Sequence, residues 1–226
     1  MLKLADITPA HKKDDRYNKS NYRPVSLLPA VSKIFERVLY KQIDKYIDSK
    51  LSKYLCGFRA GHSTQTCLLV LNEKWRKAID GKGFAGVLLT DLSKAFDCLN
   101  HNLLIAKLSA YGFDYNSLKL IGSYLDNRYQ RVRINSMYSN WNKIIFGVPQ
   151  GSILGSLLFN IYINDLFLLC ENSKMANYAD DNSPYATEKE IDLVTSKLAT
   201  DAHELVSWVS SNGLKANPNK FHMILY

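Results

Sequence analysis

Tyr178-Ala179-Asp180-Asp181 is the most informative stretch of this 226-residue chain. Two adjacent carboxylates stand among apolar and neutral polar residues, at what the flanking pattern predicts to be the tip of a hairpin. A third carboxylate, Asp91, ends an apolar run far upstream. Neighbouring like charges are costly to keep ionised, so a stabilising partner is expected. Two divalent cations about 4 Å apart would supply it, because such a pair clamps the attacking and leaving oxygens of a phosphoryl transfer.

The same tetrapeptide has a plainer interpretation as a solvated turn. Asp and Asn favour turns because their side chains bond to the local backbone. The tetrapeptide alone favours this plainer interpretation, so the decision rests on the remainder of the chain.

The composition is that of a basic globular protein. Hydrophobic residues make up 46% of the chain and charged residues 22%, which excludes a disordered chain. The length suits one large domain or two small lobes. The formal net charge is +8 and the pI about 9.2, which fits a polyanionic partner such as nucleic acid. A basic balance also serves solubility, so the charge supports this partner without deciding it.

The cysteines and the apolar segments exclude several other classes. The four cysteines are Cys56, Cys67, Cys98 and Cys170. Their spacing fits neither a zinc site nor a dense disulfide framework, so we expect free thiols in a reducing, intracellular compartment, nuclear or cytoplasmic. No apolar run follows the N-terminus, which excludes a signal peptide there. Polar residues interrupt the apolar segment 153–170, so it predicts a buried core helix and no membrane partner.

Periodicity predicts an α+β fold. Helices are expected at 31–47, 65–79, 101–111, from 153 onward and at 188–210. Strands are expected at 84–90, 129–134, 140–146, 174–179, 183–186 and 221–226. The first 25 residues are expected to be irregular, with Pro29 in the first turn of the helix that follows. A mainly antiparallel sheet backed by helices could bring Asp91 and Asp180 to one edge.

Five segments, in this order, resemble the reverse transcriptase domain of non-LTR (LINE-type, jockey-like) retrotransposons. They are Asn21-Tyr22-Arg23-Pro24-Val25-Ser26-Leu27-Leu28, Gly57-Phe58-Arg59-Ala60-Gly61-His62-Ser63-Thr64, Thr90-Asp91-Leu92-Ser93-Lys94-Ala95-Phe96-Asp97, Gly147-Val148-Pro149-Gln150-Gly151-Ser152-Ile153-Leu154-Gly155 and Tyr178-Ala179-Asp180-Asp181. A weaker sixth match is Asn217-Pro218-Asn219-Lys220. One departure is Gly155-Ser156, where the family usually has Gly-Pro; a helix tolerates this serine.

The resemblance implies a right-hand polymerase in which residues 1–226 form one reverse transcriptase domain. The fingers would span about 1–83 and the palm about 84–226 with interleaved fingers segments. The palm would be an antiparallel sheet backed by helices. The chain would lack a complete thumb and an endonuclease domain, and would be a partial product of a longer frame.

The resemblance also implies a catalytic centre. Asp91, Asp180 and Asp181 would ligate two Mg²⁺ ions, with Mn²⁺ as a substitute. Lys220 would protonate the leaving pyrophosphate as a general acid. Phe96 would lie under the incoming sugar, where its ring would clash with a 2′-hydroxyl and favour deoxynucleotides.

Further residues would bind substrate and nucleic acid. Gln150 and Gly151 would line the nucleotide pocket, where glycines allow close backbone approach. Arg23 and Lys13 would hold the triphosphate. Contacts to the template strand would come from Phe58, Arg59 and Tyr178. For the arginines of 128–133, a track for duplex backbone and a plain exposed strand face remain open.

The implied reaction is RNA-directed DNA synthesis: addition of dNTPs to a DNA primer 3′-hydroxyl on an RNA or DNA template. A group II intron-type reverse transcriptase is an alternative within the same chemistry. Phe96 argues against a viral RNA-dependent RNA polymerase, which must admit the 2′-hydroxyl. A different alternative is an inactive or co-opted fragment that binds nucleic acid without turnover.

Overall fold

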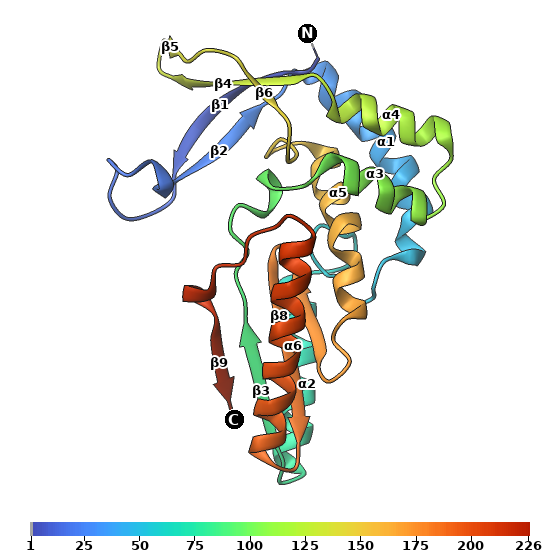
Figure 1. Cartoon of the computed structure of the whole chain (residues 1–226), viewed down its shortest axis with the longest axis vertical. Helices are drawn as coiled ribbons and strands as arrows, with labels where there is room; N and C mark the ends of the chain where they lie inside the picture. The colour runs from blue at the N-terminus through green and yellow to red at the C-terminus, as the bar shows by residue number, and fades with distance from the viewer. Residues whose placement is uncertain (1) are drawn as a thin grey trace. The chain divides into compact units, whose positions relative to one another are not determined.

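The computed structural model describes residues 2–226 and divides the chain into two compact units. The first unit is Met1–Ser49 with Phe96–Phe159, and the second is Lys50–Ala95 with Asn160–Tyr226. Each unit contains a sheet and helices (Figure 1), so the α+β prediction is confirmed. No helix within residues 2–226 combines the length and apolar character that a bilayer crossing requires.

The sheet of the first unit has the strand order β2-β1-β4-β5, and β6 also pairs with β4. Its strands are β1 (Leu4–His11), β2 (Tyr22–Leu27), β4 (Arg128–Ile134), β5 (Met137–Tyr138) and β6 (Asn142–Ile144). β1 runs antiparallel to β2 and parallel to β4. The predicted two-residue turn Asn135-Ser136 joins β4 to β5.

The prediction of irregular structure in the first 25 residues is wrong, because that segment forms β1 and most of β2. Pro9 and Pro24 obscured the strands, since proline cannot donate to a sheet ladder. The structure places them opposite each other, where β1 no longer pairs with β4. Non-local pairing with β4 thus makes a strand that local propensity does not indicate.

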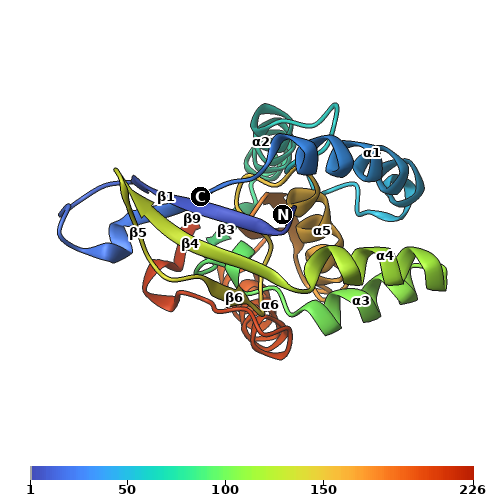
Figure 2. The ribbon, with the colours of Figure 1, turned by 90° about the horizontal axis from the view of Figure 1, so that it is seen from above.

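Three helices complete the first unit: α1 (Ala30–Ile47), α3 (His101–Ala110) and α4 (Tyr115–Leu125). α3 and α4 lie side by side (Figure 2). α4 is not among the predicted helices, although Asp114 caps its N-terminus by accepting from the N–H groups of Asn116 and Ser117. Pro29 is the N-cap of α1 and precedes its first turn.

The predicted apolar face of α1 is only partly buried. The buried residues are Ser32, Glu36, Leu39, Ile43 and Ile47. Exposed apolar residues of the same helix are Val31, Ile34, Phe35, Val38 and Tyr46. The buried stripe is therefore polar at its N-terminal end, which becomes important at the site.

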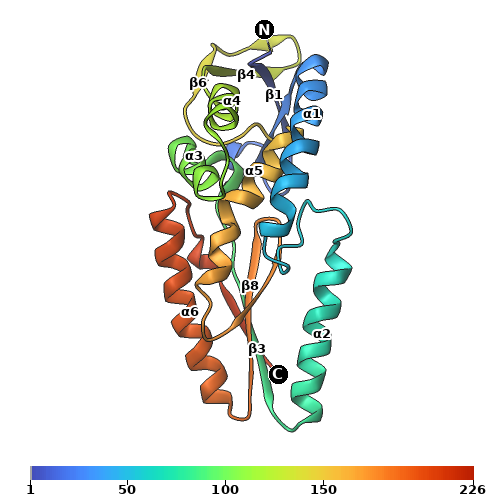
Figure 3. The same cartoon turned by 90° about the vertical axis from the view of Figure 1, so that its right-hand side faces the viewer.

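The second unit is an antiparallel sheet of order β7-β8-β3-β9 between two helices (Figure 3). Its elements are α2 (Thr64–Asp80), β3 (Phe84–Leu89), β7 (Lys174–Tyr178), β8 (Asp181–Glu188), α6 (Ile191–Ser211) and β9 (His222–Leu225). Tyr185 packs with Leu71 of α2, whereas its neighbour Ala186 packs with Val194 of α6. Successive strand residues face opposite ways, so the helices cover opposite faces.

Helix α5 (Ile153–Ile163) runs from the first unit into the second. Its residues from Leu157 to Ile163 are almost entirely inaccessible to solvent. This confirms the predicted core helix, which continues as a 3-10 helix over Asn164–Leu168.

Candidate functional site

The Asp180-Asp181 pair lies at the tip of a hairpin, as predicted. Tyr178 of β7 is in register with Asp181 of β8, which leaves Ala179 and Asp180 as a two-residue loop. Ala179 has a φ of +58°. Hairpins with positive φ at the first loop residue favour glycine there, so alanine holds this turn at a conformational cost.

The sheet register brings Asp91 to the same end of the sheet as the hairpin. β3 pairs with β8 so that Val87 faces Tyr185, and the bridge Thr90↔Asn182 continues this register. Asn182 O accepts from Thr90 N at 3.1 Å and from Thr90 Oγ1 at 2.7 Å. The next position places Asp91 opposite Asp181, on the same face of the sheet.

Lys220 pairs with Asp91 in this arrangement. Lys220 Nζ lies 2.9 Å from Asp91 Oδ2, and Asn217 N donates to Asp91 O at 2.9 Å. Within residues 2–226 no three His, Cys, Asp or Glu side chains lie close enough together to hold a metal ion. The backbone thus gathers three carboxylates at one sheet end, while their side chains are not yet arranged around a common point.

The loop that contains Gly57 supports the hairpin from within the second unit. A Cβ on Gly57 would lie 2.2 Å from Ala179 N and 2.6 Å from Ala179 Cα, so only glycine fits without a shift. Cys56 N donates to Asn177 O at 3.3 Å, and Asn160 Nδ2 donates to Gly57 O at 2.8 Å. Sequence reasoning assigned this motif to the template strand and missed its support of the hairpin.

The three predicted nucleic-acid contacts lie in the second unit. Phe58 is 44% exposed, with a φ of +57°. Arg59 Nη1 donates to the carbonyl oxygens of Ser52 and Leu55, which fixes the loop as well as the guanidinium. Tyr178 is 37% exposed beside the turn.

The Gly147–Gly151 loop belongs to the first unit, and backbone contacts hold its first residue. Gly147 N donates to Leu99 O, and His101 Nε2 donates to Gly147 O, both at 2.7 Å. Gly147 has a φ of +79°, and a Cβ there would lie 2.7 Å from the backbone of Asp97. Both the φ and the close approach require glycine.

The other end of the loop is held by Gln150. Its Nε2 donates to Asp97 Oδ1 at 3.0 Å, and its carbonyl accepts from Ser26 N at 2.9 Å. Gly151, with a φ of +104°, follows at an exposed position.

Phe96 is tied to this loop. Val148 N donates to Phe96 O at 2.9 Å. The half-buried ring of Phe96 stacks on Phe159, with centroids 4.4 Å apart and an interplanar angle of 24°. The ring is therefore held in one orientation by a neighbour in its own unit.

Glu36 is a buried carboxylate that sequence reasoning missed. It has no solvent exposure, and its Oε2 accepts from Ser152 Oγ at 2.8 Å, Ile153 N at 2.7 Å and Leu154 N at 3.3 Å. It thus caps the N-terminus of α5, directly after the Gly147–Gly151 loop. The available signal was its spacing, because Glu36 follows Ser32 by four residues and precedes Ile43 by seven.

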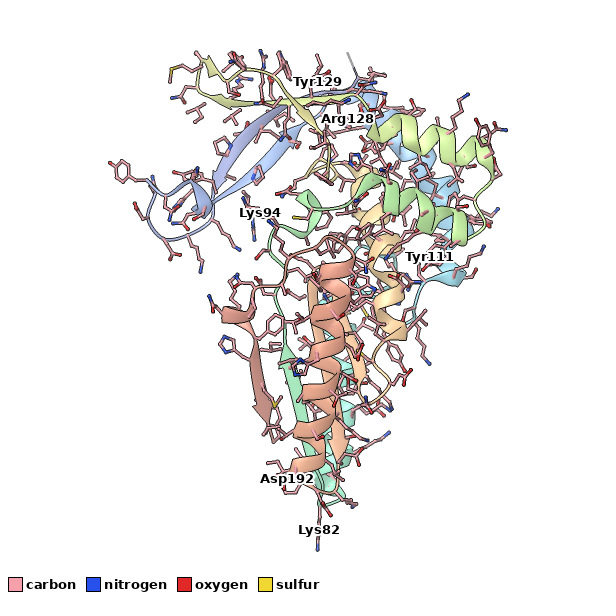
Figure 4. The ribbon with its side chains drawn as sticks, viewed as in Figure 1. Lys82, Lys94, Tyr111, Arg128, Tyr129 and Asp192 are labelled. Atoms are coloured by element: carbon pink, nitrogen blue, oxygen red, sulfur yellow. The ribbon has the colours of Figure 1, made fainter. Side chains whose placement is uncertain are left out.

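Tyr124 and Arg128 extend the polar network around Glu36. Tyr124 OH lies 2.7 Å from Ser152 Oγ, and the Arg128 guanidinium lies 4.9 Å from the Tyr124 ring centroid. Burial, and then the Glu36 charge, raise the pKa of Tyr124 far above its ordinary value. Arg128 is 3% exposed at the start of β4 (Figure 4).

The three arginines of β4 do not form one exposed stripe. Arg128 is buried, and Arg131 Nε pairs with Asp6 Oδ1 at 2.7 Å while its guanidinium lies between the rings of Tyr138 and Trp141. Arg133 is exposed. A continuous basic track along this strand is therefore wrong.

The two predicted triphosphate ligands lie in the first unit. Arg23 is an exposed residue of β2, in register with Ala10. Lys13, in the connection between β1 and β2, lies 3.6 Å from the Asp14 carboxylate and is exposed.

Comparison with known proteins identifies the family. Residues 10–225 match the family model described as reverse transcriptase (RNA-dependent DNA polymerase). The probable RNA-directed DNA polymerase from transposon BS of Drosophila melanogaster is 31% identical over 228 residues, which cover 96% of this chain and 25% of that protein. The RNA-directed DNA polymerase from mobile element jockey of the same species is 28% identical over 228 residues, with the same two coverages.

Solved structures agree at the level of fold. Apo telomerase from Candida tropicalis, truncated from its C-terminal domain, superposes with a TM-score of 0.64 at 12% identity, covering 100% of this chain and 50% of that one. The chain spans about a quarter of the length of the curated relatives it matches. The family match covers nearly the whole chain, and the jockey relative confirms the resemblance found in the motifs. The chain therefore belongs to the reverse transcriptase family of RNA-dependent DNA polymerases.

Proposed function

We propose that this chain catalyses RNA-directed DNA synthesis, adding dNTPs to the 3′-hydroxyl of a DNA primer on an RNA template. The observation that carries the proposal is the β3–β8 register, which puts Asp91 opposite Asp181 and next to the hairpin residue Asp180. Three carboxylates at one sheet end are hard oxygen ligands of the kind that Mg²⁺ prefers. In this proposal the palm spans about 84–226 and the fingers about 1–83, with interleaved segments.

The carboxylates fit a divalent-metal site by their chemistry and exposure. Asp91 is half-buried and Asp181 exposed, so both can rotate toward a common ion. Lys220 pairs with Asp91 Oδ2 and so places a positive charge beside the carboxylates. When bound, two Mg²⁺ ions, or Mn²⁺ in their place, would neutralise the charge that develops on the transferred phosphate. Lys220, freed from Asp91, would then carry a proton to the leaving pyrophosphate.

The first unit would supply the nucleotide pocket. Gln150 and Gly151 end the Gly147–Gly151 loop, and Gly151, exposed and without a Cβ, would let a nucleotide approach the backbone closely. Phe96, stacked on Phe159 and tied to Val148, would lie against the sugar and exclude a 2′-hydroxyl. The exposed cations Arg23 and Lys13 would hold the triphosphate.

The template would lie against the second unit. Phe58 and Tyr178 are exposed aromatic rings suited to stacking on bases. Arg59, whose guanidinium is anchored to the carbonyl oxygens of Ser52 and Leu55, would place a positive charge near a template phosphate.

Primer extension on poly(rA)/oligo(dT) with Mg²⁺ tests the proposal. The wild type should incorporate dTTP in a metal-dependent way, and Asp180→Asn should not. Binding of primer–template without extension by the wild type would instead identify a protein that binds nucleic acid without turnover.

A further inference from the structure

A pair of buried asparagines lies beneath the Asp180-Asp181 turn. Asn177 is the last residue but one of β7 and Asn182 the second residue of β8, and they face each other in the sheet register. Their exposures are 1% and 0%. Most amides buried this completely are hydrogen-bonded, so their partners indicate what they do. The NH₂ groups of both asparagines and Oδ1 of Asn182 have partners, whereas Asn177 Oδ1 has none within residues 2–226.

The pair holds every carbonyl of the turn. Asn177 Nδ2 donates to Ala179 O at 2.8 Å and to Asp181 O at 3.4 Å, and Asn182 Nδ2 donates to Asp180 O at 3.2 Å. The two amides also bond to each other, from Asn177 Nδ2 to Asn182 Oδ1 at 2.9 Å. An amide nitrogen carries two hydrogens, so the long contact from Asn177 Nδ2 to Asp181 O can only share a hydrogen with a shorter bond. The bonds to Ala179 O and Asp180 O orient the two loop peptides, which offsets the strain of a positive φ at Ala179.

The same two residues join the turn to its neighbours. Asn182 O receives both Thr90 N and Thr90 Oγ1, immediately before Asp91. Asn177 O receives Cys56 N, immediately before Gly57. These two links are made by backbone carbonyls and join the hairpin to the strand that leads to Asp91 and to the supporting loop, whereas the side-chain amides act on the turn itself.

We propose that Asn177 and Asn182 are positioning residues that hold Asp180 and Asp181 in the geometry required for divalent-metal binding. This inference rests on the proposed function. Successive residues along a strand alternate between faces, so the amides lie on the face opposite the Asp91 and Asp181 side chains. They act on the carboxylates through the backbone, and they add no charge to a region already rich in negative charge.

Leucine substitutions separate the orientation of the carboxylates from the contribution of the two asparagines to the stability of the protein. Asn182→Leu leaves the buried Asn177 amide without one acceptor, so it should lower the melting temperature. The double variant Asn177→Leu/Asn182→Leu removes both partners and should recover much of that loss, because paired polar groups can be replaced together at small cost. Asn182→Leu removes the bond to Asp180 O, and the double variant removes the bonds to Ala179 O and Asp181 O as well.

The experiment is titration of the full chain with Mn²⁺, followed by the electron paramagnetic resonance signal of the free ion. Both leucine variants should bind Mn²⁺ about tenfold more weakly than the wild type, the loss expected when groups that orient metal ligands are removed. Primer extension should fall in parallel at subsaturating metal and recover partly at high metal. Recovery of wild-type Mn²⁺ affinity in the double variant, together with its stability, would overturn the inference.

Asn212→Leu is the matched control. Asn212 is also a buried asparagine of the second unit, and its Nδ2 donates to Trp208 O at 2.9 Å. This variant should lose stability and keep wild-type Mn²⁺ affinity. If the double leucine variant stays destabilised, its Mn²⁺ affinity is compared with that of Asn212→Leu under conditions that give the two the same melting temperature. Equal Mn²⁺ affinities would contradict a positioning role for Asn177 and Asn182.

Asp180→Asn separates failure of the inference from failure of the proposed function. If this variant loses Mn²⁺ binding while the leucine variants bind normally, the metal site stands and the positioning role falls. If the wild type neither binds Mn²⁺ nor extends a primer, the proposed function itself falls, and the inference with it.

Discussion

The Gly147–Gly151 loop and the Asp180-Asp181 hairpin are held by opposite chemistry. Around the loop, backbone bonds are joined by two carboxylates: Asp97 accepts from Gln150, and Glu36 accepts from the N-terminus of α5. Around the hairpin the supports are neutral: two amides, a glycine and backbone carbonyls. Each segment lies in a different unit, so each is supported from within its own unit.

Charge explains the difference. A carboxylate at a helix N-terminus is stabilised by free N–H groups and the helix dipole, so Glu36 suits the loop that leads into α5. A further carboxylate beside Asp180 and Asp181 would add like-charge repulsion, whereas an amide orients a carbonyl at no electrostatic cost. Four substitutions test this comparison. One changes the hairpin carboxylate, two remove a support, and one changes the aromatic ring tied to the loop.

Asp180→Asn has the largest expected effect. A ligand that contributes several kcal/mol to the transition state corresponds to about a thousandfold in rate. We expect primer extension to fall by at least that factor, while the melting temperature stays the same or rises because a like charge is removed from the hairpin. Single-turnover extension and thermal unfolding measure the two effects. Mg²⁺-dependent extension near the wild-type rate would show that Asp180 is not a metal ligand.

Glu36→Ala tests the carboxylate support. It leaves the N–H groups of Ile153 and Leu154 without their acceptor in a buried site, at a cost of about 3 kcal/mol in the free energy of unfolding. Urea unfolding measures the loss, and the KM for dNTP should rise as the loop before α5 loses its support. Glu73→Ala is the control, because Glu73 is an exposed helical glutamate that pairs with Lys77. Equal stability losses in the two variants would contradict a special role for Glu36.

Gly57→Ala tests the neutral support. The new Cβ would overlap the backbone of Ala179, so the hairpin must shift, and overpacking of this kind costs about 1–3 kcal/mol. We expect lower stability together with weaker Mn²⁺ binding. Gly122→Ala in α4 meets only Ile105 Cδ1 at 3.9 Å and should be neutral or slightly stabilising. Unchanged Mn²⁺ affinity in Gly57→Ala would show that the loop does not support the hairpin.

Phe96→Val has the smallest expected effect and tests whether the first unit selects the sugar of the incoming nucleotide. Removing the ring should raise the ratio of kcat/KM for rNTP to that for dNTP by about tenfold, within the range that a pocket reshaped by a few methylene groups provides. Loss of the stack on Phe159 should also lower stability slightly. An unchanged ratio would mean that Phe96 only packs against Phe159.

Secondary structure could be predicted from the sequence where the signal is local. The hairpin tip, the buried helix after Gly151 and the long helix before the final strand all follow from turn residues and periodicity. β1 could not be predicted in this way, because its pairing with β4 joins residues more than 100 positions apart in sequence. β2 was missed with it, because β2 pairs with β1.

The supports of the site escaped prediction for a similar reason. Asn177 and Asn182 flank the motif and resemble ordinary turn residues, and only the register shows that their side chains meet. Glu36 interrupts an apolar face, and its role as a cap depends on a helix N-terminus more than 100 residues away in sequence. Motifs identified the carboxylates, whereas the groups that orient them depend on three-dimensional contacts.

The most direct test of the account is a crystal structure of the chain with Mn²⁺, using anomalous scattering to locate the ion. The account predicts an anomalous peak about 2.2 Å from carboxylate oxygens of Asp91 and Asp180, with Lys220 displaced from Asp91 and the Asn177–Asn182 hydrogen bond intact. A peak bound elsewhere, or none at saturating Mn²⁺ with Lys220 still paired to Asp91, would contradict it.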